Sequence, residues 1–132
     1  MQPSISIITI GVDDLERAFA FYRALFEISD EQIGAGPDHV AFFISDTLSF
    51  VLFAREQLAQ TAGKEIAIAG TPGFVLSHQA QSPAEVDEIL LQVLAAGGAI
   101  ITEGTQSEWG YSAYFEDSEG NVWEVMAALP AN

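Results

Sequence analysis

Hydrophobic and polar positions change their period several times along the first half of the chain. Residues 4–12 carry isoleucines on both parities, which favours a strand with both faces at least partly covered. Residues 13–28 then place apolar side chains every three or four positions, which predicts an amphipathic helix. We expect Asp13 to cap the first amides of this helix, with Glu16 three residues on.

The chain after this helix has shorter apolar runs. A loop rich in glycine and proline is expected at 34–37, and it is followed by two short strands in the sequences HVAFFIS and LSFVLF, residues 39–45 and 48–53. Residues 55–60 are expected to form a helical turn, and residues 61–73 a connection between the two halves.

The second half repeats the order of the first. A strand is expected at 73–80, and a helix follows in which Ser82 is the cap, Glu85 completes a capping box and Gly97 or Gly98 ends the helix. Three further strands are expected at 99–103, 111–115 and 121–127. The chain therefore has a duplicated unit of one strand, one helix and three strands.

Composition limits what such a chain does. The 132 residues, 49% of them hydrophobic, suffice for the core of a single domain. There is no cysteine, which excludes disulfides, thiolate metal sites and a cysteine nucleophile. Nineteen acidic residues against four basic ones give a formal charge of −15, which disfavours binding to nucleic acid or to an anionic membrane surface. This acidity either keeps the protein soluble or attracts a cationic ligand.

The first residues show no basic start, and no apolar run reaches the ~20 residues that cross a bilayer. We therefore expect a soluble, cytoplasmic protein.

Two segments resemble the vicinal oxygen chelate superfamily, which includes glyoxalase I, extradiol dioxygenases, fosfomycin-modifying enzymes and bleomycin resistance proteins. The first is VDDLERAFAFY at 12–22, and the second runs from SPAEVDEILLQVLAAGGAIIT at 82–102 into EWGYSAYFEDSEGNVWEVM at 108–126. Ser118 stands where the family usually has proline. The resemblance implies an α+β fold in which residues 1–132 form one domain. It consists of two βαβββ modules, 1–70 and 71–132, which form a curled open sheet around a cavity, with the helices on its convex face.

The resemblance also implies four inward positions that hold a metal ion in the metal-dependent relatives. The first falls here on Ile7, the second on Val51, or on Ser49 if the register is slipped by two, and the third near Val75. None of these is a good ligand for a divalent metal, and the fourth position falls on Glu124. We therefore expect no metal and no other cofactor. The alternative is a divalent metal held by Glu124 and His78, which requires the register of the second module to differ by one residue.

Strand alternation together with this resemblance predicts the residues that face the cavity. The predicted ligand-binding residues are Glu124, Tyr114, Gln79, Ser77, Trp109, Tyr111, Thr9 and Phe53. Glu124 is either an anchor or general base among apolar side chains, or a rim carboxylate that touches water. Trp109 and Tyr111 either stack on a flat or cationic ligand or pack within their own loop.

The function that these features favour is metal-free binding of an apolar or cationic small molecule, as in the bleomycin resistance proteins, with antibiotic sequestration as its best defined form. The alternative is a metal-dependent lyase, isomerase or dioxygenase of the same superfamily, and a structural or interaction protein is a third class. No catalytic residue is identified. A homodimer is expected, because open curled modules leave apolar edges that commonly pair by two-fold symmetry.

Overall fold

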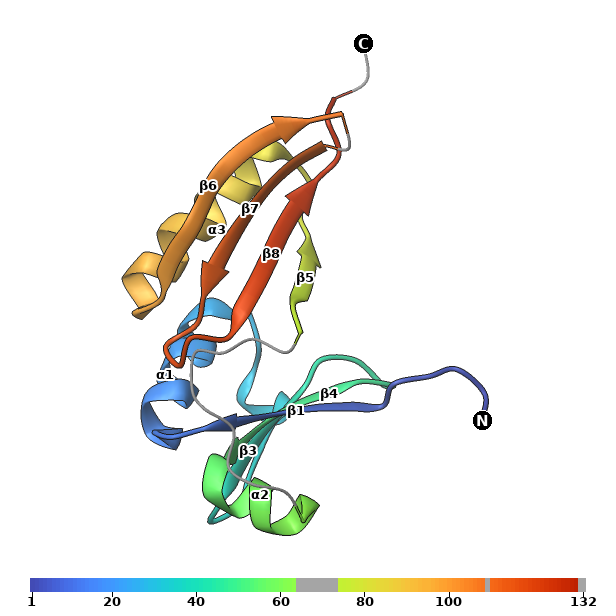
Figure 1. The fold of residues 1–132 in the computed structure, drawn as a ribbon, viewed down its shortest axis with the longest axis vertical. Helices are drawn as coiled ribbons and strands as arrows, with labels where there is room; N and C mark the ends of the chain where they lie inside the picture. The colour runs from blue at the N-terminus through green and yellow to red at the C-terminus, as the bar shows by residue number, and fades with distance from the viewer. Residues whose placement is uncertain (64–73, 109, 131–132) are drawn as a thin grey trace. The chain divides into compact units, whose positions relative to one another are not determined.

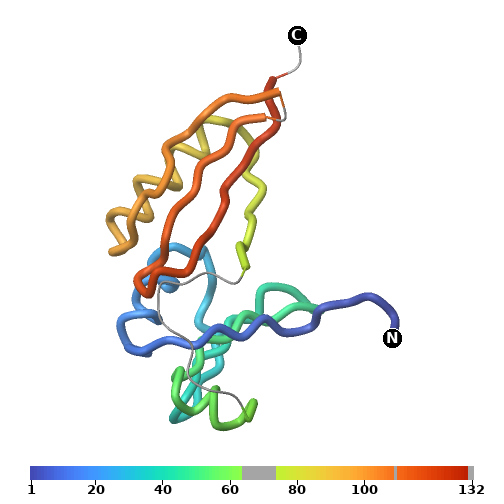
Figure 2. The backbone as a smooth tube through the Cα atoms, viewed as in Figure 1, coloured from blue at the N-terminus to red at the C-terminus, as the bar shows by residue number. Residues whose placement is uncertain are grey.

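The computed structural model describes residues 1–63, 74–108 and 110–130. The chain divides into two compact units, Met1–Ala69 and Gly70–Asn132, which are traced in Figures 1 and 2. Each unit has its own four-stranded mixed sheet.

The first unit has the sheet order β1-β4-β3-β2. Strand β1 is parallel to β4, whereas β3 is antiparallel to both β4 and β2. The elements are β1 (Ile7–Val12), α1 (Leu15–Leu25), a short 3-10 helix η1 (Asp30–Gln32), β2 (Ile33–Ala35), β3 (His39–Phe43), β4 (Ser49–Ala54) and α2 (Arg55–Ala62).

The core of this unit lies between α1 and one face of the sheet. Tyr22 on α1 packs edge-on against Phe50 of β4, with ring centroids 5.0 Å apart, and Phe42 and Leu52 are fully buried beside them. Because side chains alternate along each strand, the residues between these buried positions face the other way. The opposite face of the sheet therefore carries Thr9 together with Val51 and Ala41, which lie in line with it on β4 and β3.

The second unit repeats this topology with the order β5-β8-β7-β6, in which β5 is parallel to β8 and the other pairs are antiparallel. Its elements are β5 (Leu76–Gln79), α3 (Pro83–Ala96), β6 (Ala99–Ser107), β7 (Gly110–Glu116) and β8 (Val122–Ala127). Figure 1 shows α3 lying along one face of this sheet. The duplicated order of one strand, one helix and three strands is confirmed.

Helix α3 forms where its sequence predicts. The Ser82 hydroxyl accepts from the amide of Glu85, Pro83 occupies the first turn, and Gly97 ends the helix with a φ of 100°. Its buried residues Val86, Leu90 and Val93 face Ala113, Phe115 and Val125 of the sheet, all of which are buried. Because the apolar stripe of α3 is buried against alternate residues of the strands, α3 covers one face of this sheet and leaves the other face open.

Several sequence-based expectations differ from the structure. The cap of α1 is Asp14, whose Oδ1 accepts from the amide of Arg17 at 3.0 Å, and Asp13 instead pairs with Arg55. Strand β2 forms partly within the expected loop, because Gly34 and its neighbours pair with β3. Helix α2 extends past a single turn. Most of the expected connection lies outside the described residues, as does the first residue of the strand expected at 73–80.

Strand β6 also runs four residues beyond its expected end, because register shifts after Ile100 and Thr102 let it continue along β7. No helix in the described parts of the chain is long and apolar enough to span a membrane.

Candidate functional site

Glu124 lies at the centre of the open face of the second sheet. Strand β8 runs between β5 and β7, and the register places Glu124 opposite Ser77 on one side and Tyr114 on the other. The Ser77 hydroxyl donates to Oε1 of Glu124 at 2.9 Å, and the Tyr114 hydroxyl donates to Oε2 at 2.9 Å. Each carboxylate oxygen therefore accepts one hydrogen bond from a neutral hydroxyl group.

Strand alternation explains why these three side chains meet. Ala113 and Val125, which neighbour Tyr114 and Glu124 in the sequence, are fully buried on the side of α3. Their neighbours must therefore point to the opposite face. The apolar core that fixes the sheet against α3 thus positions the polar group on the other face.

The carboxylate changes the acidity of its tyrosine partner. The hydrogen bond to Glu124 and the negative charge of that carboxylate raise the pKa of Tyr114 above its usual value of 10.0, with a smaller contribution from burial. Tyr114 therefore remains a protonated donor over the neutral range. A carboxylate offers about four lone-pair positions, so two hydroxyl donors leave Glu124 able to accept further hydrogen bonds.

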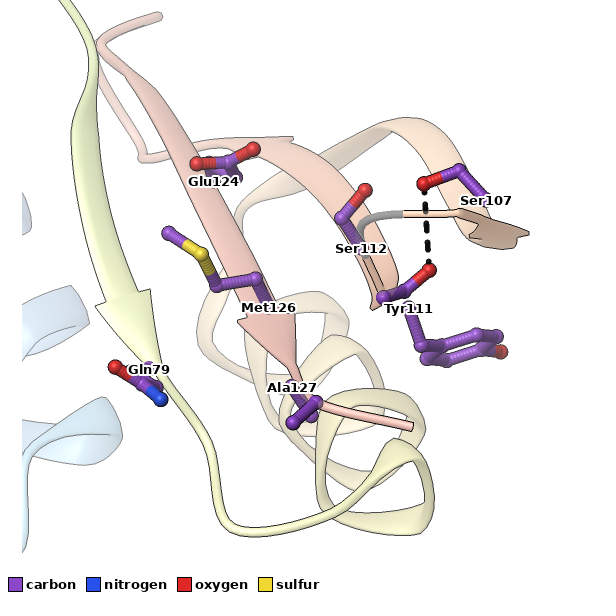
Figure 3. Close-up of a pocket in the computed structure, with 9 residues that line it drawn as sticks. Gln79, Ser107, Tyr111, Ser112, Glu124, Met126 and Ala127 are labelled. Atoms are coloured by element: carbon purple, nitrogen blue, oxygen red, sulfur yellow. Dashed lines mark hydrogen bonds between the residues drawn. The ribbon is translucent and has the colours of Figure 1, made fainter. Parts of the chain in front are cut away.

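A pocket of about 220 Å³ opens beside Glu124. It is lined by residues of the second unit, namely Gln79, Ser107, Gly110, Tyr111, Ser112, Glu124, Met126, Ala127 and Ala128. Figure 3 shows Gln79, Ser112, Glu124 and Met126 around this space. An apolar wall with a few polar groups is the usual composition of a small-molecule site, although the volume is at the small end of the range of ~300–1,000 Å³ for drug-sized ligands.

Glycine is required where β7 begins at the edge of this pocket. Gly110 has a φ of 139°, and a Cβ atom there would lie 2.6 Å from the carbonyl oxygen of Ala127. The absence of a side chain thus lets β7 approach the end of β8 closely. The Ser107 hydroxyl donates to the Gly110 carbonyl at 3.5 Å and links the two ends of the β6–β7 turn (Figure 3).

Tyr111 contributes to the lining of the pocket, but its ring points away from Glu124 (Figure 3). Its hydroxyl donates to Oδ1 of Asp87 on α3 at 2.6 Å, and this bond, with a smaller effect of burial and nearby charge, raises the pKa of Tyr111 above 10.0. The hydroxyl of Tyr111 is therefore bonded to α3 and not within its own loop. Trp109 lies outside the described residues.

The other predicted ligand-binding residues fall in two places. Ser77 belongs to the hydrogen-bonded group, and Gln79 lies two residues further along β5, opposite Met126. Thr9 and Phe53 belong to the first unit, on β1 and β4. The pocket beside Glu124 is lined by neither of them.

Sequence reasoning missed a second arranged polar group, which lies in the first unit. His39 Nδ1 and Oδ1 of Asp38 are 2.8 Å apart, and the imidazole ring stacks on Phe53 at 5.7 Å with an angle of 12° between the planes. Gly36 packs against the ring so closely that a Cβ atom would lie 2.5 Å from Cε1. In the sequence, the adjacent residues Asp38 and His39 could have indicated this pair.

The residues present do not fit the divalent metal ion that the fold implies. The expected positions Ile7, Val51 and Val75 provide no ligand atom. His78 pairs with Val125 in the register, so alternation puts its side chain on the face opposite to Glu124. The described residues contain no group of three or more histidines and carboxylates that could hold a metal ion. One carboxylate does not fit the three protein ligands of a catalytic divalent site.

The duplication supplies an internal comparison. Val51 of β4 pairs with Thr9 and Ala41 in the first sheet, as Glu124 of β8 pairs with Ser77 and Tyr114 in the second. The same three ladder positions thus carry a polar group in one unit and largely apolar side chains in the other.

Comparison with known proteins gives one family match. The family model described as the Glyoxalase/Bleomycin resistance protein/Dioxygenase superfamily matches residues 4–125. A search of the curated proteins found no match.

Solved structures of similar fold cover nearly the whole chain. A glyoxalase-related enzyme from Fulvimarina pelagi superposes with a TM-score of 0.83 at 23% identity, covering 96% of this chain and 88% of that one. The fosfomycin resistance protein FosX from Listeria monocytogenes gives a TM-score of 0.71 at 25% identity, with coverages of 97% and 95%. A lactoylglutathione lyase from Agrobacterium tumefaciens gives 0.70 at 24% identity, covering 96% of each chain.

Proposed function

The chain belongs to the glyoxalase/bleomycin resistance protein/dioxygenase superfamily, and within it we propose that the chain is a metal-free binding protein for an apolar or cationic small molecule. The proposed site is the pocket beside Glu124 on the second sheet. The observation that carries this proposal is the position of Glu124, a single carboxylate held by two hydroxyl groups at the edge of a pocket with an apolar wall.

The hydrogen bonds of Glu124 support binding more than metal catalysis. Ser77 and Tyr114 fix the orientation of the carboxylate with neutral donors, so that it is preorganised toward the pocket. Such a group orients a ligand through hydrogen bonds while Met126, Ala127 and Ala128 cover its apolar part. The corresponding biological role is the capture of a small drug-like molecule. If that molecule is an antibiotic, its sequestration confers resistance.

Thermal shift measurements with a panel of small aromatic molecules, neutral and cationic, test this proposal. We expect at least one class to raise Tm, because a ligand that binds the folded state stabilises it by mass action. The shift should shrink in Glu124→Gln. Glu88→Gln is the matched control, because it removes the same charge from an exposed position on α3 outside the pocket.

Elemental analysis of the dialysed protein provides the second arm. We expect zinc, iron, nickel and manganese well below one equivalent, because the described part of the chain offers no group of ligands that would complete a metal site with Glu124. A near-stoichiometric metal that resists dialysis, or the absence of any thermal shift across the panel, would overturn the proposal.

A metal-dependent enzyme is the second candidate, because the solved structures of this fold include a lactoylglutathione lyase and a fosfomycin resistance protein. Turnover of lactoylglutathione, or consumption of fosfomycin, in the presence of added divalent metal would favour it. The sequence offers few cationic partners for the carboxylates or phosphonate of these substrates, with only four basic residues in the chain.

A further inference from the structure

The distribution of charge along the chain is uneven in a way that concerns Glu124. Residues 70–132 contain nine acidic residues and neither lysine nor arginine. All four basic residues, Arg17, Arg23, Arg55 and Lys64, lie in the first 69 positions. The unit that carries the pocket therefore has no permanently cationic side chain of its own to neutralise Glu124.

Two arginines of the first unit already have carboxylate partners there. Arg23 Nη2 lies 2.6 Å from Oδ1 of Asp30, and Arg23 Nη1 also donates to the carbonyl of Ile28. Arg55 Nε lies 2.8 Å from Oδ1 of Asp13, and its side chain is only 12% exposed.

The hydrogen bonds that Glu124 accepts within its unit come from uncharged donors. Ser77 and Tyr114 donate to the carboxylate as neutral hydroxyl groups. A carboxylate forms stronger hydrogen bonds with an ionised N–H donor than with a neutral one. The remaining lone pairs of Oε1 and Oε2 are the acceptors for such a donor.

From these observations we propose that the ligand recognised at Glu124 is a small ammonium ion that bears N–H groups, a primary or secondary amine in its protonated form. This inference rests on the proposed binding function and names the class of its ligand. One N–H donates to Glu124, and the side chains of Gln79 and Ser112 lie along the same pocket as further acceptors. The carbon skeleton of the amine covers Met126, Ala127 and Ala128.

The same geometry disfavours a quaternary ammonium ion. Such a cation has no N–H to donate, and proteins commonly bind it against the faces of several aromatic rings. Among the described residues that line the pocket, the one aromatic side chain is Tyr111, whose ring points away from Glu124 (Figure 3). The hydroxyl of Tyr111 is held instead by Asp87.

Three probes with a common benzyl group separate the alternatives. Benzylammonium carries the charge and the N–H donors, benzyltrimethylammonium carries the charge alone, and benzyl alcohol carries a neutral donor. Kd is measured by calorimetry or by chemical shift titration at pH 7, at low salt and at about 0.15 M salt, where the Debye length is ~8 Å.

We expect benzylammonium to bind at least about tenfold more tightly than either of the other two probes, at both salt concentrations. Glu124→Gln should remove most of this preference, whereas Glu88→Gln should change it less than about twofold, because a distant exposed charge is screened. Circular dichroism of both variants checks that they are folded.

Each other outcome is decisive. Equal binding of benzylammonium and benzyltrimethylammonium, or equal losses in the two variants, would show attraction by net charge alone and would overturn the inference. Preferential binding of benzyl alcohol would overturn the inference while leaving small-molecule binding intact. If none of the probes binds, and the broad thermal shift panel also shows no ligand, the proposed function fails with it. If none of the probes binds but the panel reveals another ligand, the ammonium inference alone is overturned.

Discussion

Tyr114 and Glu124 face each other across the β7–β8 ladder, and the tyrosine hydroxyl donates to Oε2 of the carboxylate at 2.9 Å. On the other side of β8, Ser77 holds Oε1 at the same distance. The orientation of this carboxylate is therefore set by the hydrogen-bonding groups of its two neighbouring strands. A second tyrosine, Tyr111, is bonded in a similar way to Asp87.

The two tyrosines should respond separately to loss of their carboxylate partners. Glu124→Gln is expected to lower the pKa of Tyr114 toward 10.0, because the hydrogen bond to a charged acceptor is the main cause of its rise. Asp87→Asn should lower the pKa of Tyr111 for the same reason. NMR titration of the tyrosine Cζ resonances measures both values. Each variant is the control for the other, and a shift of both pKa values in either variant would contradict the local cause.

Alkaline pH should destabilise the protein through the same two hydroxyls. Because their folded-state pKa values are raised, their stabilising contribution is complete below pH 10.0 and is lost as the pH rises through the folded values. Urea denaturation between neutral pH and pH 11 is expected to show this decline. The double variant Tyr111→Phe/Tyr114→Phe should show a shallower decline over that interval. An identical slope in this variant would assign the alkaline loss to other groups.

Gly104→Ala should be destabilising because of the position of the Tyr111 ring. A Cβ atom at residue 104 would lie 1.9 Å from the tyrosine hydroxyl oxygen and 2.2 Å from Cζ, so the ring would have to leave its bond with Asp87. We expect a loss of about 1–3 kcal/mol in the free energy of unfolding, as for other overpacked sites. In a Tyr111→Ala background the same substitution should cost much less. A cost of equal size in both backgrounds would show that the glycine is needed for another reason.

Two neighbouring substitutions in the turn between β7 and β8 should affect the free energy of unfolding differently. Asp117 is 4% exposed and accepts from the amides of Glu119 and Asn121 and from the Asn121 side chain. Asp117→Ala should cost about 2 kcal/mol or more, because three donors lose a charged acceptor.

The neighbouring Ser118 hydroxyl is buried and has no hydrogen-bond partner among the described residues. Ser118→Ala should therefore be neutral or stabilising by up to about 1 kcal/mol, since it removes an unsatisfied polar atom. Chemical denaturation measures both changes. A clear loss of stability in Ser118→Ala would show that this hydroxyl has a partner in solution.

The fold was predictable because its core residues recur with a regular period. The stripe on α3 and the alternation of Ala113 with Tyr114 depend on local spacing, which the sequence displays directly. The same alternation, together with the family resemblance, predicted that Tyr114, Ser77 and Glu124 share a face, and this face carries the hydrogen-bonded group.

What the sequence did not predict depends on contacts between distant residues. Asp13 and Asp14 are the same residue type, so either could cap the helix. Asp14 is the cap, and Asp13 pairs instead with Arg55, which lies 42 residues further along the chain. The ring of Tyr111 turns to α3 because Gly104 leaves room for it and Asp87 accepts a hydrogen bond from its hydroxyl. Strand β2 has only three residues, too few to show an alternating pattern in the sequence. It forms because it pairs with β3.

The two ladders that share one register also bear on how this chain could acquire a site. Thr9, Val51 and Ala41 occupy the places that Ser77, Glu124 and Tyr114 occupy in the other half, and in both halves the fold is fixed by side chains on the reverse of the sheet. The two halves thus carry different side chains at these three ladder positions, although each has a sheet of the same topology. Substitutions on the exposed face of either half can therefore add or remove polar groups without disturbing the buried side chains that hold that half together.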